Sequence, residues 1–483
     1  MTAILGGGIA GLSAAFYALE NPRLGALTLY EASDRLGGWI RSKRSPTGAM
    51  FEKGPRTMRS TGIGGKNTLR IIEELNLTDR VISIGPNHPA AKKRLIYADK
   101  SLHVLPNSFM DLLKIRAPLK RPLILSLWNE LKAPRVEKDD EDLYSFVERR
   151  LGKDVAEYLI SPMVCGIAAG DAKKLSVNFL MRSMFEAEQK HGSILKGTLK
   201  TNRMQGDIEK KRLEDMKNTT LGRTTKGPSK LALRAEKEKW AVWTLEGGLE
   251  QFPIAMAEHV GGKVDVQFKK CSNLTFAPGK VDVEVDGKVQ KFDKVISSLP
   301  AKNLAPMVRQ QHPELADELE AIPSVTVAVI NFEFEENILP CEAFGFLVPP
   351  NQNLPLLGVI FDSCVYPQKS TVVTAMMGGA WFDHHFGSNP TEDNLLSIAL
   401  EQLRITLNVK VNPVNVDVEI LKDCIPQQIV GHDARMKRIR EYITDHGMAL
   451  AICGSSYQGV GVNDVILSSK NAIDDMLLRD INA

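Results

Sequence analysis

The feature that most constrains this chain is the glycine-rich stretch near its start, "AILGGGIAGLSAAFYALE". Gly6, Gly8 and Gly11 have G-x-G-x-x-G spacing between a short apolar run and a helix-like segment. In such a unit the first glycine permits a tight turn, the second lets a pyrophosphate approach the backbone, and the third allows close helix packing. The pattern therefore predicts a Rossmann-like dinucleotide-binding unit whose helix N-terminus faces phosphate.

An acidic residue downstream supports the same prediction. We expect a second strand over residues 26–30, and Glu31 follows it, twenty residues after Gly11. A carboxylate in that position accepts hydrogen bonds from a ribose hydroxyl. The motif and its acid do not separate NAD from FAD, and the motif alone would also fit a glycine-rich turn without a ligand.

Composition limits the other classes of protein. With 483 residues, 43% of them hydrophobic, the chain is expected to form two or three globular domains. A net charge of +3 predicts no nucleic-acid partner. The six cysteines include no C-x-x-C pair, and the pair His384-His385 has no carboxylate or cysteine at ligand spacing. Neither a disulfide framework nor a metal site is predicted.

The sequence also bears on membranes and targeting. No signal-peptide pattern precedes the first strand, so a mitochondrial address would have to be non-cleaved or internal. The longest uncharged stretch, residues 343–361, contains Pro349, Pro350 and Pro355, which argues against a transmembrane helix.

Changes in the pattern of apolar, glycine and charged residues along the chain predict its domains. Strand and glycine-turn patterns at residues 1–88, 241–300 and 425–483 indicate one α/β domain built from discontinuous segments, because "ICGSSYQGVGVNDVI" repeats the strand, turn and helix order of the N-terminus. Residues 301–424 contain long β segments and are expected to form a mixed-sheet, α+β substrate domain. Residues 89–200 read as helical, and residues 201–240 as a charged, exposed insertion joining the substrate domain.

One helical stretch is unusually basic and apolar. The segment "LPNSFMDLLKIRAPLKRPLILSLWNELKAPR" carries six cations among large apolar residues, opposed only by Asp111 and Glu130. It could lie in a membrane interface, with cations near anionic headgroups. An ordinary helical subdomain with a buried apolar face is the alternative.

Together these pieces resemble the flavin-containing amine oxidase superfamily. Its FAD fingerprint adds a second element, R-x-G-G, here Arg35, Gly37 and Gly38, which NAD-binding Rossmann domains usually lack. Within the superfamily, "FEKGPRTMR", "AAKKRLIY", "FGFLVP", "MMGGAW" and "SSYQGVGVNDVI" resemble the protoporphyrinogen oxidases of the mitochondrial type. The resemblance covers nearly the whole chain and is weakest over residues 201–240.

The resemblance implies an activity and a setting. It implies noncovalent FAD and the oxidation of protoporphyrinogen IX to protoporphyrin IX, with molecular oxygen as acceptor and hydrogen peroxide as product. It further implies a homodimer on the intermembrane-space side of the mitochondrial inner membrane, in contact with the membrane surface through the helical segment. Ferrochelatase is the expected recipient of the product.

The resemblance also implies site residues. Arg94 is expected to pair with a propionate, a task suited to a guanidinium, and the apolar pocket wall comprises Phe344, Gly345, Leu347 and Met376. The expected cofactor contacts are Gly6, Gly7, Gly8, Ile9, Ala10, Gly11, Glu31, Ala32, Trp39, Gly54, Pro55, Arg56, Thr57, Cys271, Ser455, Val460, Gly461 and Val462. No side chain is assigned as catalytic base.

Two other functions remain open at this point. An amine oxidase or a carotenoid-type desaturase would share the FAD signature but offer a different substrate cavity. A non-catalytic binding protein resembling Rab GDP-dissociation inhibitor would keep the fold without using flavin. Intact Arg35, Gly37 and Gly38 argue against the second alternative.

Overall fold

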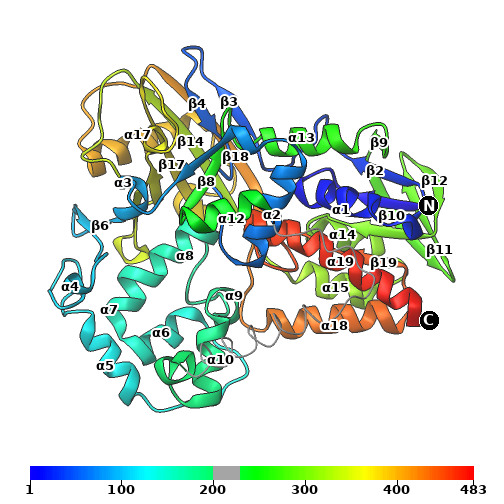
Figure 1. Cartoon of the computed structure of the whole chain (residues 1–483), viewed down its shortest axis with the longest axis horizontal. Helices are drawn as coiled ribbons and strands as arrows, with labels where there is room; N and C mark the ends of the chain where they lie inside the picture. Colours follow the sequence, from blue (N-terminus) through cyan, green and yellow to red (C-terminus); the bar gives the residue numbers. More distant parts are fainter. Residues whose placement is uncertain (200–228, 483) are drawn as a thin grey trace.

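The computed structural model describes residues 1–199 and 229–482. Figure 1 shows a parallel sheet and its helices near the two chain ends, a larger sheet on the other side, and a group of helices below that larger sheet. Every helix in the described part of the chain is too short or too polar to cross a lipid bilayer.

The N-terminal strand lies in the middle of a five-stranded sheet in which all neighbours run parallel. Four of its strands are short apolar runs, typical of strands buried on both faces. In spatial order the strands are β19 (Leu450–Ile452), β13 (Lys294–Ser297), β1 (Thr2–Leu5), β2 (Leu27–Glu31) and β9 (Asp265–Phe268).

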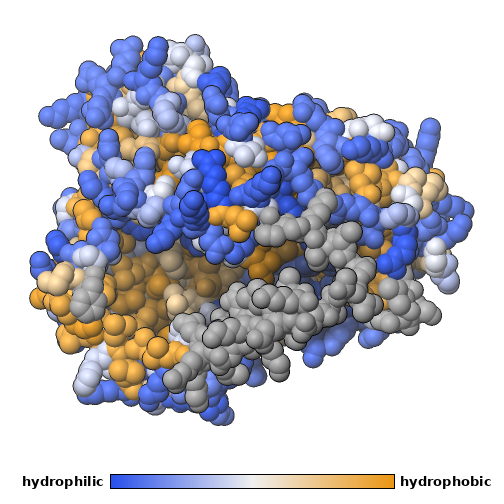
Figure 2. Space-filling model, in the orientation of Figure 1, coloured by the Kyte–Doolittle hydropathy of each residue, from blue (hydrophilic) through white to orange (hydrophobic). Residues whose placement is uncertain are grey.

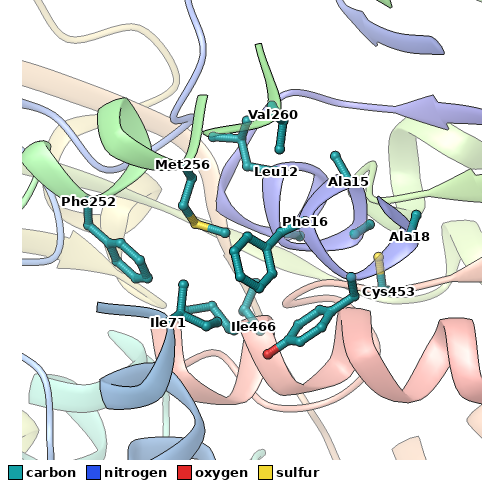
Figure 3. Close-up of a cluster of buried hydrophobic side chains, with 14 of the residues drawn as sticks. Leu12, Ala15, Phe16, Ala18, Ile71, Phe252, Met256, Val260, Cys453 and Ile466 are labelled. Carbon is teal, nitrogen blue, oxygen red and sulfur yellow. The ribbon is translucent and has the colours of Figure 1, made fainter. Parts of the chain in front are cut away.

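Helix α1 (Ile9–Leu19) is the centre of the first hydrophobic core. Its small and aromatic side chains are buried from Ala10 to Ala18, and Figure 3 shows Phe16 of α1 among side chains from three surrounding helices. Those helices are α2 (Gly62–Glu74), α13 (Gln251–Val260) and α19 (Val462–Asn482).

The opposite face of the parallel sheet carries a second core. An antiparallel three-stranded sheet and three helices pack there around Tyr30, Val295 and Leu450. The alternating residues 281–285 followed by Asp286 and Gly287 predict a hairpin. The structure confirms it, because Asp286 and Gly287, with φ of +48° and +73°, join the last two strands of this sheet. These elements are β10 (Cys271–Ala277), β11 (Lys280–Val285), β12 (Lys288–Phe292), α14 (Ala301–Val308), α15 (Pro313–Glu320) and α18 (His432–Asp445).

The larger sheet has seven strands and is antiparallel except where β6 runs parallel to β15. Helix α17 (Glu392–Leu407) covers one face, and α16 (Phe382–Phe386) packs beside β17. The spatial order is β18 (Asn415–Pro426), β14 (Ser324–Phe334), β17 (Thr371–Gly379), β16 (Leu356–Ile360), β15 (Gly345–Leu347), β6 (Leu95–Ala98) and β7 (Ser101–Val104).

The helical group has its own core of Leu143, Phe146, Val164, Phe185 and neighbouring apolar residues. Its buried Arg150 and Glu130 form an ion pair that ties α5 to α6. The group contains α4 (Phe109–Leu112), α5 (Ile124–Lys132), α6 (Leu143–Leu151), α7 (Lys153–Val155), a π-helical turn (Ala156–Ile160), α8 (Ser161–Ala168), α9 (Val177–Leu180) and α10 (Arg182–His191).

Two expectations about domains need correction. Residues 89–200 are not all helical: after the single turn α3 (Pro89–Lys92), β6 and β7 form the edge of the seven-stranded sheet. Residues 230–240 are not an exposed insertion, because α12 (Lys230–Lys237) buries Leu231 and Ala235 in the core around α1. The rest of the charged insertion, residues 201–228, lies outside the described residues.

Two small antiparallel pairs connect the sheets. The first comprises β3 (Ser42–Arg44) and β4 (Met50–Glu52), and the second comprises β5 (Val81–Ile84) and β8 (Val242–Leu245). Lys53, directly after β4, is buried in ion pairs with Asp417 and Glu419 of β18. The β3–β4 pair therefore joins the glycine-rich domain to the larger sheet.

Candidate active site

The first and second glycine elements lie against each other beyond the carboxyl ends of β1 and β2. Gly8 and Gly37 form an isolated parallel bridge, and the N–H of Gly37 donates to the carbonyl of Gly7 at 2.9 Å. Ligands of open parallel sheets bind outside this edge. The structure thus brings together two motifs that are about thirty residues apart in the sequence.

The glycines leave room that side chains would occupy. A Cβ on Gly11 would lie 1.8 Å from the carbonyl oxygen of Gly6, so α1 packs on its own turn only because Gly11 lacks one. Gly38 has φ of +58°, and a Cβ on it would lie 3.0 Å from Cα of Gly8. Backbone therefore faces backbone where a diphosphate is expected.

The start of α1 is prepared for an anion. Its N-cap residue, Gly8, provides no side-chain hydrogen bond, and the first turn contains no acidic residue. Glu31 lies beside this turn and accepts from the N–H of Gly7 at 2.6 Å and from the N–H and hydroxyl of Ser33 at 2.8 and 2.7 Å. The carboxylate is thus fixed at the edge where a ribose is expected.

The Arg35 side chain binds atoms of the protein around the second glycine loop. Its guanidinium donates to the carbonyls of Gly38 and Ile40 at 2.7 and 3.0 Å and pairs with Glu250 at 2.8 Å. The arginine of this motif therefore holds the loop in shape, while the glycines provide the open backbone.

The predicted loop of residues 54–57 lies beside the second glycine loop. A Cβ on Gly54 would lie 2.2 Å from the carbonyl oxygen of Trp39, so the two loops touch through backbone. The side chain of Trp39 is 45% exposed, while Arg56 is buried. Pro55 and Thr57 are partly buried between them.

The C-terminal loop closes the same site. Asn463 donates to the carbonyl of Arg59 at 2.9 Å, and Ser469 donates to the carbonyl of Ala10 at 2.8 Å. Helix α19 therefore contacts both the 54–59 loop and α1. Ser455, Val460, Gly461 and Val462 lie in the loop that joins β19 to this helix or at its start.

The remaining predicted cofactor residues are more peripheral. Ala32 is exposed beside Glu31. Cys271 starts β10, three residues after Phe268, which pairs with Glu31 in the parallel sheet. Its side chain is partly buried against the core that contains Tyr30. The backbone of Cys271 thus lies near the carboxyl end of β2, where the adenine end of a dinucleotide is expected.

The predicted substrate residues lie in register across the larger sheet. Leu347 pairs with Gly358, Gly358 pairs with Met376, and Met376 pairs with Val329. Directly paired residues point to the same face of a sheet. Because Gly358 lacks a side chain, Leu347 can lie over it, where a Cβ would be 3.1 Å from the Leu347 side chain.

Helix α8 faces this row. A Cβ on Gly166 would lie 2.8 Å from the side chain of Leu347, and Cys165 packs with Val329 and Met376. A cavity of about 290 Å³ lies alongside, lined by Cys165, Leu357 and Trp381 among others. Figure 2 shows that the surface between the helical group and the larger sheet is hollowed and mostly apolar. A flat apolar ligand would fit such walls.

Arg94 lies at the edge of this wall. Leu95 of β6 pairs with Phe346 of β15, so Arg94 is level with Gly345. The Arg94 side chain is exposed, and Phe344 is partly buried near Tyr366. Strand β6 therefore places the cation of Arg94 beside the predicted pocket wall. Arg94 and Gly345 of that wall are about 250 residues apart in the sequence.

The sequence alone did not predict a buried polar network between the cofactor loop and the larger sheet. Arg56 pairs with Asp362 at 2.7 Å, and the Tyr366 hydroxyl donates to Glu52 at 2.7 Å. Thr374 completes the link through a 2.6 Å bond to Asp362. The available signal was an aspartate within the otherwise apolar stretch "GVIFDSCVY", because a lone acid in a buried run needs a partner.

Burial also perturbs Glu52. Desolvation raises the pKa of its carboxyl to about 7, although donors from Leu249, Tyr366 and Ser42 oppose the rise. No group of three or more His, Cys, Asp or Glu side chains in residues 1–199 and 229–482 is arranged to hold a metal ion.

These features fit FAD. The opposed glycines, the uncapped start of α1 and the fixed Glu31 suit its diphosphate and ribose. An extended FAD would run from the glycine turn before α1 toward Met376 and the substrate wall. The loops at residues 54–57 and 455–462 lie beside this route. A tricyclic ring reaching this end would meet both the Arg56 loop and the apolar row.

Comparison with known proteins identifies the family. The family described as flavin containing amine oxidoreductase matches residues 9–477. The chain is 35% identical to human protoporphyrinogen oxidase over 99% of both chains, and 31% identical to the Schizosaccharomyces pombe protoporphyrinogen oxidase over 96% of both.

Solved structures share the fold. A crystal structure of an Exiguobacterium protein superposes with a TM-score of 0.76 at 23% identity, covering 99% of this chain and 98% of the other. Cyclohexylamine oxidase from Brevibacterium oxydans superposes with a TM-score of 0.67 at 12% identity, covering 100% and 99%. The chain is therefore an FAD-dependent oxidoreductase that belongs to the flavin-containing amine oxidoreductase family, in the branch of the protoporphyrinogen oxidases.

Proposed function

We propose that this protein oxidises protoporphyrinogen IX to protoporphyrin IX in haem biosynthesis, with oxygen as electron acceptor and hydrogen peroxide as product. The observation that carries the proposal is the apolar row of Leu347 and Met376, with Arg94 at its edge and the cofactor loop at its end. Protoporphyrinogen oxidases from human, Macaca fascicularis and cattle, at 33–35% identity over 99% of this chain, support it.

The residues suit a tetrapyrrole. A porphyrinogen is a large apolar ring with carboxylates at one edge, so it needs broad apolar walls and a cation. Leu347 and Met376 supply walls, and Arg94 supplies a guanidinium for a propionate. The clearance expected at Gly345 is not left for a ligand, because the Val359 carbonyl fills the space beside it. Bound FAD would supply the acceptor for the electron pair removed in each two-electron oxidation of the macrocycle.

The reaction removes six hydrogens in three two-electron oxidations, so it consumes three oxygen molecules and releases three hydrogen peroxide molecules. No catalytic base is assigned, and the released protons pass to solvent or to an oxygen-derived acceptor. We propose that FAD is held noncovalently. In support, Cys453, the cysteine nearest the C-terminal cofactor loop, is fully buried and its thiol faces the carbonyl of Ser297 at 3.7 Å.

A stoichiometric assay tests the reaction. The purified protein is given protoporphyrinogen IX in air while porphyrin fluorescence, oxygen uptake and peroxide are recorded. We expect a ratio of three oxygen and three peroxide molecules to each porphyrin formed. Coproporphyrinogen III, which carries four carboxylates rather than two, and benzylamine serve as comparison substrates. Faster turnover of either would overturn the assignment of substrate.

We further propose that the protein binds a membrane surface. The support is an apolar patch on and near α5, which we define as Met110, Leu113, Ile115, Leu125, Leu127, Trp128 and Leu131, all of them exposed. Figure 2 shows apolar residues gathered in this region. Lys132 lies over the Trp128 ring at 4.8 Å, and Lys114, Lys120 and Arg121 are close by in the sequence. Apolar side chains rimmed by cations suit an anionic bilayer.

We also propose a location, an oligomeric state and a recipient of the product. Peripheral attachment to the mitochondrial inner membrane, on the intermembrane-space side, and a homodimer are what the family resemblance supports. The poorly soluble planar product would favour direct transfer to the next enzyme, and we propose ferrochelatase as its recipient. Fractionation of mitochondria and light scattering of the purified protein test the location and the oligomeric state.

A further inference from the structure

Residues that directly follow β16 bind both the guanidinium and the backbone carbonyl of Arg56. Asp362, in the 3-10 turn η5 (Asp362–Cys364), accepts from the Arg56 guanidinium at 2.7 Å. The Tyr366 hydroxyl, four residues later, shares its one proton between Glu52 at 2.7 Å and the Arg56 carbonyl at 3.0 Å. Arg56 is 5% exposed and Asp362 1% exposed, so this ion pair is shielded from water. One turn therefore fixes the side chain and the backbone of a cofactor-loop residue.

Asp362 is itself anchored to the strand that carries the substrate wall. Its second carboxylate oxygen lies 2.6 Å from the Thr374 hydroxyl, which shares its one proton between this oxygen and Oδ1 of Asn331, also at 2.6 Å. Thr374 and Met376 are two residues apart on β17, so they point to the same face of the sheet. The Arg56 guanidinium lies 3.9 Å from the Met376 sulfur. The carboxylate thus links the cofactor loop to the substrate wall.

We infer that Asp362 is a positioning residue for the flavin reaction. It holds Arg56, and with it the loop of residues 54–57, where FAD requires them, and it compensates the positive charge of the guanidinium beside the cofactor. A guanidinium keeps its charge in proteins, so burial makes a fixed counter-charge necessary. The inference depends on FAD binding and not on the identity of the substrate.

The variant Asp362→Asn tests both parts. It removes the charge but retains the shape, so Arg56 becomes less well held and its charge uncompensated. We expect FAD to bind about tenfold more weakly or worse, as for loss of a buried charged partner. We also expect a higher flavin midpoint potential, since an uncompensated cation favours the more negatively charged reduced flavin. A purely structural role would not raise the potential.

Two more variants keep the test decisive. Thr374→Val removes the anchor of Asp362 and retains both charges, so FAD should bind more weakly with the potential nearly unchanged. Glu333→Gln is the matched control, because Glu333 is a buried carboxylate on the same face of the sheet that bonds to Thr47, Ser370 and Asn415 instead of the cofactor loop. It should lower thermal stability without changing either FAD property.

The results that overturn the inference are specific. Asp362→Asn with wild-type FAD affinity and midpoint potential would do so, and so would equal changes in both properties in Glu333→Gln. If Asp362→Asn does not fold, unchanged FAD affinity in Thr374→Val overturns it. FAD titration and potentiometry use no porphyrinogen, so these outcomes stay separate from a failure of the proposed reaction.

Discussion

Gly345 illustrates how one residue determines the shape of the substrate wall. Its φ is +138°, and a Cβ there would lie 2.1 Å from the carbonyl oxygen of Val359. We expect Gly345→Ala to lower the free energy of unfolding by about 2 to 5 kcal/mol, through backbone strain and overpacking. Urea unfolding of the holoenzyme measures this. Gly85→Ala is the control, because a Cβ there meets nothing within 4 Å; an equal loss in the control would contradict the explanation.

Arg94 has a different role, in recognition. We expect Arg94→Ala to raise KM for protoporphyrinogen IX about thirtyfold, or about 2 kcal/mol, with little change in kcat. This is the low end for a charged pair because the side chain is exposed before substrate binds. Arg94→Lys should restore part of the affinity, and Lys93→Ala should behave as wild type. Unchanged steady-state kinetics in Arg94→Ala would remove the residue from the site.

Glu52 makes stability depend on pH. Burial raises its pKa from 4.5 to about 7, so between these values the folded protein binds more protons than the unfolded chain. Stability should therefore fall as the pH rises through this window, by up to about 3 kcal/mol from this group. In Glu52→Gln the difference in unfolding free energy between pH 5 and pH 8 should be smaller by that amount. An unchanged difference would mean that Glu52 titrates normally.

At the scale of elements, α5 combines a buried anchor with an exposed face. Glu130 is fully buried in an ion pair with Arg150 and also accepts from the N–H of Ile194 at 2.6 Å. Trp128 and Leu131, on the same helix, are 58% and 43% exposed. The anchor makes the helix a rigid support for the apolar patch, through which we propose that the protein attaches to a membrane interface.

The double variant Trp128→Glu, Leu131→Glu tests this element. We expect binding to vesicles with anionic lipid to fall at least tenfold, since two apolar contacts become charges, while the melting temperature changes little. Sedimentation with vesicles measures the binding. Val289→Glu replaces an equally exposed apolar residue on β12, remote in sequence, and should bind normally. Equal binding by all the proteins would contradict a membrane role for α5.

The elements also show where sequence reasoning works. The strand, turn and helix at Thr2–Leu19, the Asp286-Gly287 hairpin and the start of α19 were all predicted correctly, because each is specified by local glycines, caps or alternation. Strands β6 and β7 were missed, since β6 owes its place to pairing with β15, about 250 residues away. Helix α12 was also missed, because three small or apolar residues among many charges suffice to bury it.

For the molecule as a whole, the site lies where distant segments converge. The glycine turns could be predicted because residues close together in the sequence determine their conformation and their room for phosphate. The Arg56–Asp362 pair could not, because its partners are 306 positions apart and only the folded chain brings them together. The position of Arg94 beside Gly345 could not be predicted either, because it follows from the pairing of β6 with β15. The individual contact roles of the predicted site residues therefore remain predictions for experiment.

In the whole molecule, we expect bound FAD and the porphyrinogen to meet in one site and react with each other. The most direct measurement is anaerobic addition of protoporphyrinogen IX to the holoenzyme while the flavin absorbance near 450 nm is followed. We expect rapid bleaching, and return of the absorbance with porphyrin fluorescence when oxygen is admitted. Flavin that remains oxidised in the presence of protoporphyrinogen IX, but is bleached by an amine, would contradict this expectation.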